Sequence, residues 1–231
     1  MTRNIYRHKR QQRFASEDDS EQEEDEGEWK DVKCTGYKTI TFCGGINREN
    51  VVTFANLLRT MSDKLSRHVW RAGKQQSDEV ITVLLTSEGG TVDSGFSAAD
   101  HIMMCPVKVC VVADGEIASA ATLMAMGATD KIMMMPHATM LVHQLSSGIW
   151  GKLDDMKDFS ESCVKSNDMM VKLYLDRCPR LDQAKLRNLM TRELTLTAEE
   201  ALAYGFIDEI LESPWLAAAR TSRKRKGARS Q

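Results

Sequence analysis

Ser119 stands among small residues in "DGEIASAATLMAMGATDK", residues 114–131, where an apolar segment begins. A serine hydroxyl is a poor nucleophile at neutral pH unless a base, an orienting group and an oxyanion site surround it. Serine is also a preferred helix N-cap residue, which gives the same position a purely structural interpretation. The stretch is not a GxSxG elbow, because Ile117 and Ala121 stand where the glycines would be. By itself it leaves both interpretations open.

Two further stretches could supply the rest of such a site. "TSEGGTV", residues 86–92, has two adjacent glycines that could expose backbone N–H groups to an anion or form an ordinary tight turn. "MLVHQLSSGIWG", residues 140–151, places His143 at the end of an apolar strand. A histidine there could be a base or a structural residue, and spacing alone does not choose it. The rival histidines are His68, His101 and His137.

Alternating strand and helix patterns must position these stretches. Apolar or alternating runs predict strands at about 37–46, 79–86, 107–113, 130–136, 138–144 and 206–211. The run at 79–86 is continuous, as in a parallel strand covered on both faces. Helical periodicity appears at about 47–70, 92–104, 119–126, 152–177, 182–191 and 197–204. This order predicts a βαβ-type core with right-handed crossovers, whose functional groups gather where strands end and helices begin.

Size and charge suggest one folded unit with charged tails. The chain has 231 residues, 42% of them hydrophobic, and a net charge of −2, so bulk electrostatics do not indicate nucleic-acid binding. Like charges are grouped in a basic start, an acidic "EDDSEQEEDEGE" and a basic end. We therefore expect flexible tails at 1–30 and 218–231 around a folded domain at 31–217.

The six cysteines show neither CxxC pairs nor zinc-finger spacing, which favours reduced thiols and no metal site. No run approaches the ~18 apolar residues of a membrane span, and no secretion signal is recognisable. We expect a protein that is not secreted, in the cytoplasm or an organelle stroma or matrix, without membrane contact.

Four motifs, in order, resemble the proteolytic subunit of the Clp protease, ClpP, over about residues 37–212. They are "TSEGGTVDSG", "DGEIASAATLMAMGA", "MPHATMLVHQLSSGIWGKLDD" and "LTLTAEEALAYGFIDEIL". The resemblance implies an α/β fold, the ClpP or crotonase-like βαβ superhelix with a protruding handle helix. It also implies two stacked seven-membered rings, homomeric or mixed, around a chamber that receives polypeptides from an AAA+ unfoldase. No cofactor belongs to the subunit, and ATP enters only through the unfoldase.

Motif by motif, the resemblance gives each part of the site a residue. Ser119 falls on the nucleophile and His143, rather than His137, on the general base. The oxyanion amides fall on Gly90 and Ala120. The handle falls on about 144–177, and substrate is expected to pair by strand addition with Ser146, Ser147, Gly148 and Ile149. The implied reaction is peptide hydrolysis through an acyl-enzyme.

The chain departs from the family pattern at three places near this site. Glu193 occupies the position of the triad aspartate, so a Ser-His-Glu triad is expected with a longer third member. Glu88 replaces the proline of "SPGG", and Leu145 replaces the proline after "HQ". The acidic run also replaces the family's axial N-terminal loop, which leaves docking to an ordinary unfoldase open.

Because of these departures, other functions remain as alternatives. The main alternative is a weak or silent structural ring subunit of ClpR type. Acyl-thioester chemistry on a crotonase fold and a membrane signal-peptide peptidase are more distant ones.

Overall fold

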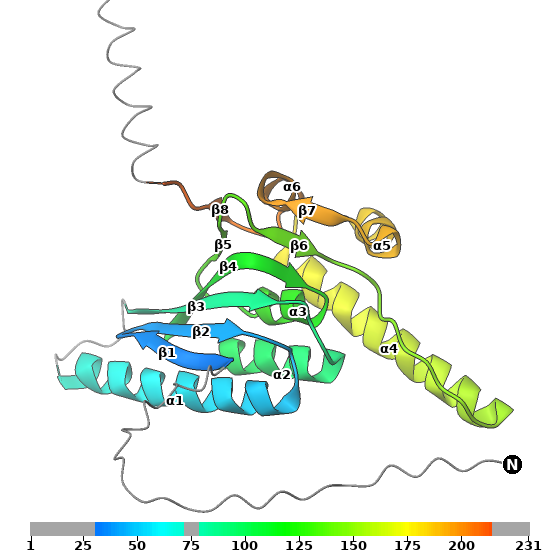
Figure 1. The fold of residues 1–231 in the computed structure, drawn as a ribbon, viewed down its shortest axis with the longest axis horizontal. Helices are drawn as coiled ribbons and strands as arrows, with labels where there is room; N and C mark the ends of the chain where they lie inside the picture. The colour runs from blue at the N-terminus through cyan, green and yellow to red at the C-terminus, as the bar shows by residue number, and fades with distance from the viewer. Residues whose placement is uncertain (1–30, 72–78, 214–231) are drawn as a thin grey trace, which may run out of the picture.

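The structure is a computed structural model that describes residues 31–71 and 79–213. The expected tails at 1–30 and 218–231 lie outside the described residues, as does the expected domain end at residue 217. Within the described ranges, strands and helices alternate around a single sheet (Figure 1). The fold class is mixed α/β, as the sequence pattern predicts.

The main sheet has the order β1-β2-β3-β4-β5-β8, and β6 joins it through β4 and β7. Its strands are β1 (Val32–Gly36), β2 (Thr39–Cys43), β3 (Val80–Ser87), β4 (Lys108–Ala118), β5 (Ile132–Met134), β6 (Thr139–Leu141), β7 (Thr195–Thr197) and β8 (Glu209–Ile210). β1 runs antiparallel to β2, whereas β2, β3, β4, β5 and β8 run parallel to one another. β6 is parallel to β4 and antiparallel to β7.

β4 changes its partner part-way along its length. Its first half pairs with β5 up to Ala113, and its last residues pair with β6 from Glu116 to Ala118. Between them the register against β3 shifts, and Asp114–Glu116 is exposed. The hydroxyl of Thr86 in β3 donates a hydrogen bond to the Asp114 carbonyl at this irregularity. A bulge of this kind bends a strand and re-aims its end, so the end of β4 is directed toward β6.

Six helices complete the described part of the chain. They are α1 (Arg48–Arg71), α2 (Val92–Met103), α3 (Ala120–Met126), α4 (Leu153–Arg177), α5 (Gln183–Arg192) and α6 (Ala198–Tyr204). α1, α2 and α3 lie on one face of the sheet (Figure 1). Along β3 every second residue from Ile81 to Ser87 is buried and the residues between are only half-buried, so the prediction of a strand covered on both faces is wrong for this strand. A strand covered on both faces is found instead at the centre of β4, where residues 109–113 are all buried.

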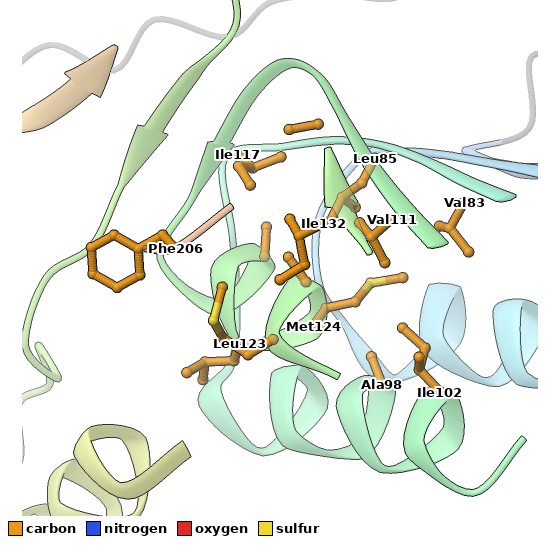
Figure 2. Close-up of a cluster of buried hydrophobic side chains, with 14 of the residues drawn as sticks. Val83, Leu85, Ala98, Ile102, Val111, Ile117, Leu123, Met124, Ile132 and Phe206 are labelled. Carbon is orange, nitrogen blue, oxygen red and sulfur yellow. The ribbon is translucent and has the colours of Figure 1, made fainter. Parts of the chain in front are cut away.

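The core lies between the sheet and these helices. Figure 2 shows strand residues such as Val83, Leu85 and Val111 facing Ile102 of α2 and Met124 of α3. Helices α2 and α3 approach closely because Gly95 has no side chain: a Cβ there would lie 2.8 Å from the Ala120 carbonyl oxygen. This packing holds the first turn of α3 against α2.

α4 extends away from the sheet, and residues 144–152 run beside it (Figure 1). Its buried residues, Met170, Val171 and Tyr174, all lie near its C-terminal end, whereas Leu153, Met156 and Val164 are exposed. Residues 144–152 form no strand in the described chain, because no neighbouring strand is available to pair with them. The protruding handle helix predicted from the sequence is present.

Candidate active site

Ser119 has a backbone conformation that few non-glycine residues adopt. It follows β4 directly, with φ 55° and ψ −125°, the values of the first central position of a type II′ turn. Holding a non-glycine residue there costs on the order of 1–3 kcal/mol and is common at functional sites. Ser119 occupies the N-cap position of α3, but its side chain makes no capping hydrogen bond there. The position is therefore that of a cap, while the hydroxyl remains free for another role.

The turn after β3 packs against Ser119. Gly89 has a φ of 101°, and a Cβ on it would lie 2.6 Å from the Ser119 Cβ and 2.7 Å from the Ala118 carbonyl oxygen. Only glycine fits this position, both for its backbone conformation and for its contact. The two glycines of "SEGG" therefore bring a turn of main chain directly beside the hydroxyl-bearing residue.

The amide of Gly90 faces away from its neighbouring strand segment. Ile46 donates to the Gly89 carbonyl at 2.7 Å and accepts from the Thr91 amide at 2.9 Å, so these bonds use the residues on either side of Gly90. Gly90 is exposed, and its own N–H makes no hydrogen bond to any described residue. The N–H of Ala120, the first residue of α3, belongs to the group that a helix leaves without an internal partner. Two unused amides therefore flank Ser119 in the described chain.

His143 is brought to Ser119 by strand register. The last pair of the parallel β4–β6 ladder is Ala118 with Leu141, and the Ser119 amide donates to the Leu141 carbonyl at 2.9 Å. Ser119 is one residue beyond that pair on β4, and His143 is two residues beyond it on β6. His137 precedes β6 and lies at the opposite end of that strand, and His101 is exposed on α2. The side chain of His68 is not among those described.

Glu193 faces His143 from the end of α5. It is the C-cap of this helix, with φ 52° and ψ 43°, and Oε1 lies 3.9 Å from His143 Nδ1. The histidine side chain is 18% exposed and that of Glu193 is 61% exposed. His143 Nδ1 is buried and has no hydrogen-bond partner among the described residues. The pair is thus within ion-pair range but longer than a hydrogen bond.

The serine and histidine follow the ends of two paired strands without being bonded to each other. No hydrogen bond between Ser119 and His143 occurs among the described residues. Catalytic hydrogen bonds are often long in the absence of substrate and shorten only in the complex. Side-chain movements would therefore be needed to connect hydroxyl, imidazole and carboxylate.

Two hydrogen bonds position the segment after His143. The Gln144 amide donates to the Met190 carbonyl of α5 at 3.1 Å, and the Leu145 amide donates to Asn167 Oδ1 of α4 at 3.2 Å. The next four residues are all exposed; they are Ser146, Ser147, Gly148 and Ile149. Their backbone is available to a ligand on the side next to the site.

In the described ranges, no three His, Cys, Asp or Glu side chains are grouped so that they could hold a metal ion. No helix in those ranges is both long and apolar enough for a membrane crossing.

Comparison with known proteins identifies the family of the chain. The family model described as Clp protease matches residues 36–214. The chain belongs to the Clp protease family. The match covers every residue of the site described above and all six helices.

The relatives are distant members of this family. The chain is 26% identical over 155 residues to "ATP-dependent Clp protease proteolytic subunit 1" of Protochlamydia amoebophila, covering 66% of this chain and 75% of the relative. It is 28% identical over 142 residues to "ATP-dependent Clp protease proteolytic subunit" of Dehalococcoides mccartyi, covering 61% and 70%.

A solved structure confirms the fold. A mutant of ClpP1 from Listeria monocytogenes matches with a TM-score of 0.65 and 21% identity, covering 77% of this chain and 93% of that chain. The ClpP-type fold expected from the four motifs is thereby confirmed.

Three residues next to this Clp-type site do not stand out in the sequence. Gly89, rather than Gly90, makes the close contact with Ser119. Thr122 and Tyr174 form a buried hydrogen bond beneath the first turn of α3. For Thr122 a signal exists, since a threonine three residues after Ser119 can reach its carbonyl in a helix. Tyr174 is 52 residues away from Thr122, and only the packing of α4 on α3 brings them together.

Proposed function

We propose that the chain is a ClpP-type serine endopeptidase subunit with a Ser-His-Glu triad. Ser119 is the nucleophile, His143 the general base, and Glu193 orients the imidazole. The Gly90 and Ala120 amides form the oxyanion site. No cofactor takes part in the subunit.

One observation carries this proposal. Ser119 has a φ of 55° at the end of β4, in contact with the turn containing Gly89 and one strand away from His143. A strained serine beside an unused amide and a half-buried histidine has the parts that acyl transfer requires. The role of helix cap explains neither the strain nor the missing capping bond.

The reaction follows from these parts. His143 Nε2 removes the Ser119 proton while Oγ attacks the peptide carbonyl, and the carbonyl π electrons move onto oxygen to form the oxyanion. Collapse of this intermediate breaks the C–N bond, and the amine leaves with the proton from His143. Water then attacks the ester by the same route, releasing the acid and restoring Ser119. Glu193 stabilises the imidazolium formed in each step.

The exposed segment Ser146–Ile149 holds the substrate by strand addition. Extended backbone binds extended peptide through main-chain hydrogen bonds, which recognise any sequence in an unfolded conformation. This is consistent with hydrolysis of unfolded polypeptides.

The assembly belongs to the same proposal. The folded unit at 31–217 forms two stacked seven-membered rings, homomeric or mixed, with the handle at about 144–177 between them. An AAA+ unfoldase supplies substrate and uses the ATP. We place this assembly in the cytoplasm or an organelle stroma or matrix, away from membranes and nucleic acid.

A structural ring subunit of ClpR type is the second candidate. The observation in its favour is the 3.9 Å separation of His143 Nδ1 from Glu193 Oε1, which leaves the imidazole without a hydrogen-bonded orienter. A triad that never closes would leave Ser119 unreactive.

A fluorophosphonate probe separates the two candidates. The purified full-length chain, checked for fold and assembly, is treated with the probe beside Ser119→Ala. We expect covalent labelling of the wild type and none of the variant. A folded, assembled wild type that does not label would refute the enzyme and favour the structural subunit.

A further inference from the structure

A buried hydrogen-bond chain connects α4 to the peptide group that follows Ser119. The Thr122 hydroxyl donates to the Ser119 carbonyl oxygen at 2.6 Å, and the Thr122 amide donates to the same oxygen at 3.0 Å. The Tyr174 hydroxyl lies 2.7 Å from the Thr122 hydroxyl oxygen. Both side chains are fully buried, with relative exposures of 0%.

The direction of this chain is fixed by the number of protons. Thr122 has one hydroxyl proton, which is donated to the Ser119 carbonyl. The Tyr174 hydroxyl must therefore donate to Thr122, because otherwise the two oxygens would face each other without a proton. Burial raises the pKa of Tyr174 far above its usual value, so this hydroxyl keeps its proton under all physiological conditions.

The Ser119 carbonyl and the Ala120 N–H belong to one peptide group. A trans peptide is planar, so its C=O and N–H point in opposite directions and turn together, and no described peptide bond is cis. Fixing the carbonyl oxygen against Thr122 therefore fixes the direction of the Ala120 N–H. Hydrogen bonds to the carbonyl also polarise the peptide and strengthen the N–H as a donor.

We propose that Thr122 and Tyr174 are positioning residues that aim and polarise the Ala120 amide toward the reaction oxyanion. They act through the Ser119–Ala120 peptide and do not touch substrate. The inference rests on the proposed function, because it assigns a task only if Ser119 is the nucleophile. It adds a second contribution from α4, whose Asn167 also holds the Leu145 amide next to the site.

Four variants isolate the hydroxyls. Thr122→Val removes the donor but leaves the Tyr174 hydroxyl buried and unpaired, so Thr122→Val/Tyr174→Phe removes both without an orphaned group. Thr122→Ser keeps the donor. Tyr204→Phe is the matched control, since Tyr204 contacts the same Phe206 ring as Tyr174 but lies at the surface.

The readouts are kcat and KM on a short fluorogenic peptide, and inhibition by a peptide aldehyde and the matching alcohol. The aldehyde adds the Ser119 oxygen to its carbon and places an oxyanion at the amides, whereas the alcohol binds without one. Removing an oxyanion donor outright costs 10²–10³ in kcat. Because the Thr122 amide still holds the carbonyl, we expect the double variant to lose about five- to thirtyfold in kcat, with KM within about twofold.

Aldehyde affinity should fall by a similar factor while alcohol affinity is unchanged. Thr122→Ser and Tyr204→Phe should both stay within about twofold of wild type. A purely structural role predicts lower unfolding temperatures without the difference between aldehyde and alcohol. Equal losses for the two inhibitors, unchanged kcat in the double variant, or a Thr122→Ser as impaired as Thr122→Val would each overturn the inference.

Failure of the proposed function looks different. A folded wild type that neither labels with fluorophosphonate nor binds the aldehyde more tightly than the alcohol refutes both proposals together. A wild type that labels, with variants that behave as the wild type, refutes the positioning role alone.

Discussion

His143 and Glu193 lie opposite each other on the continuation of the β6–β7 ladder. The last antiparallel pair of that ladder is Leu141 with Thr195, and two further residues along each chain lead to His143 and Glu193. Both residues lie outside the paired strands, and Glu193 is in a left-handed conformation, so its carboxylate reaches the imidazole from the end of the helix. Strand register brings the two chain segments together, and the left-handed C-cap of α5 accompanies the 3.9 Å separation of Nδ1 and Oε1.

Glu193→Gln should slow peptide hydrolysis by about ten- to a hundredfold in kcat. The substitution removes the charge that stabilises the imidazolium, but the loss is smaller than for a buried triad aspartate because Glu193 is 61% exposed and screened by solvent. Glu199→Gln, an exposed glutamate on α6, is the control and should leave kcat unchanged. Steady-state kinetics on a short peptide would decide, and equal rates for both variants would show that another group orients His143.

Gly89→Ala should abolish activity, whereas Gly205→Ala should not. Both glycines have a positive φ, 101° and 84°, and alanine there costs about 1–2 kcal/mol in backbone energy. Only at Gly89 does the added Cβ also collide with Ser119. Unfolding measurements should therefore show a similar backbone cost in the two variants. Fluorophosphonate labelling should be lost only in Gly89→Ala, where the serine is displaced. Full labelling of folded Gly89→Ala would contradict the contact.

Ser147→Pro and Gly148→Pro should differ in their effect on KM. Successive amides of an extended strand point to opposite edges, so only one of these two amides can face a paired substrate strand, and proline removes its donor. We expect one variant to raise KM about tenfold or more, and the other to change it little. Both should label with fluorophosphonate, which does not need the strand. If both or neither variant raises KM, substrate does not pair with this segment as proposed.

Asp182→Asn should change how the free energy of unfolding depends on pH. Asp182 caps α5, and the hydrogen bond from the Lys185 amide holds the pKa of its carboxyl below the usual value. A lowered folded pKa adds stability that is present above the ordinary carboxyl pKa of ~3.9 and is lost as the pH falls through the folded value. Urea unfolding at pH 6 and pH 3 should show a smaller acid loss for Asp182→Asn, because asparagine caps without titrating. Identical losses in the two proteins would exclude a contribution from this carboxyl.

The sequence predicted the helices and the parallel strands well because their signals are local. One such signal is the capping box of Thr197 and Glu200, with Gly205 in a left-handed conformation after the helix. β1 and β7 were not predicted: β1 is short and mostly exposed, and β7 contributes only Leu196 to the core. The extension of β4 to Ala118 was also missed, because its exposed "DGE" reads as a turn although it is a bulge within a strand.

The sequence indicates some residues of the candidate site but not the contacts between them. Local composition left Ser119 and His143 open, and the resemblance of four ordered motifs selected them; in the structure the two residues follow the paired strands β4 and β6. The strained backbone of Ser119 and the contact with Gly89 depend on how the β3 turn packs, which no spacing encodes. The partnership of Thr122 with Tyr174 depends on the packing of α4 against α3, and for that reason it could not be read from either segment.

The way β4 divides its pairing between β5 and β6 has a consequence for biosynthesis. Ser119 leaves the ribosome 24 residues before His143 and 74 before Glu193, as their positions show. The strand that carries the serine can pair with β3 early, but β6 and β7 must be synthesised before the histidine and glutamate reach it. A nascent or truncated chain therefore has the hydroxyl without its partners. Under the proposed function, the order of the elements along the chain keeps the newly made subunit inert until its last third has folded.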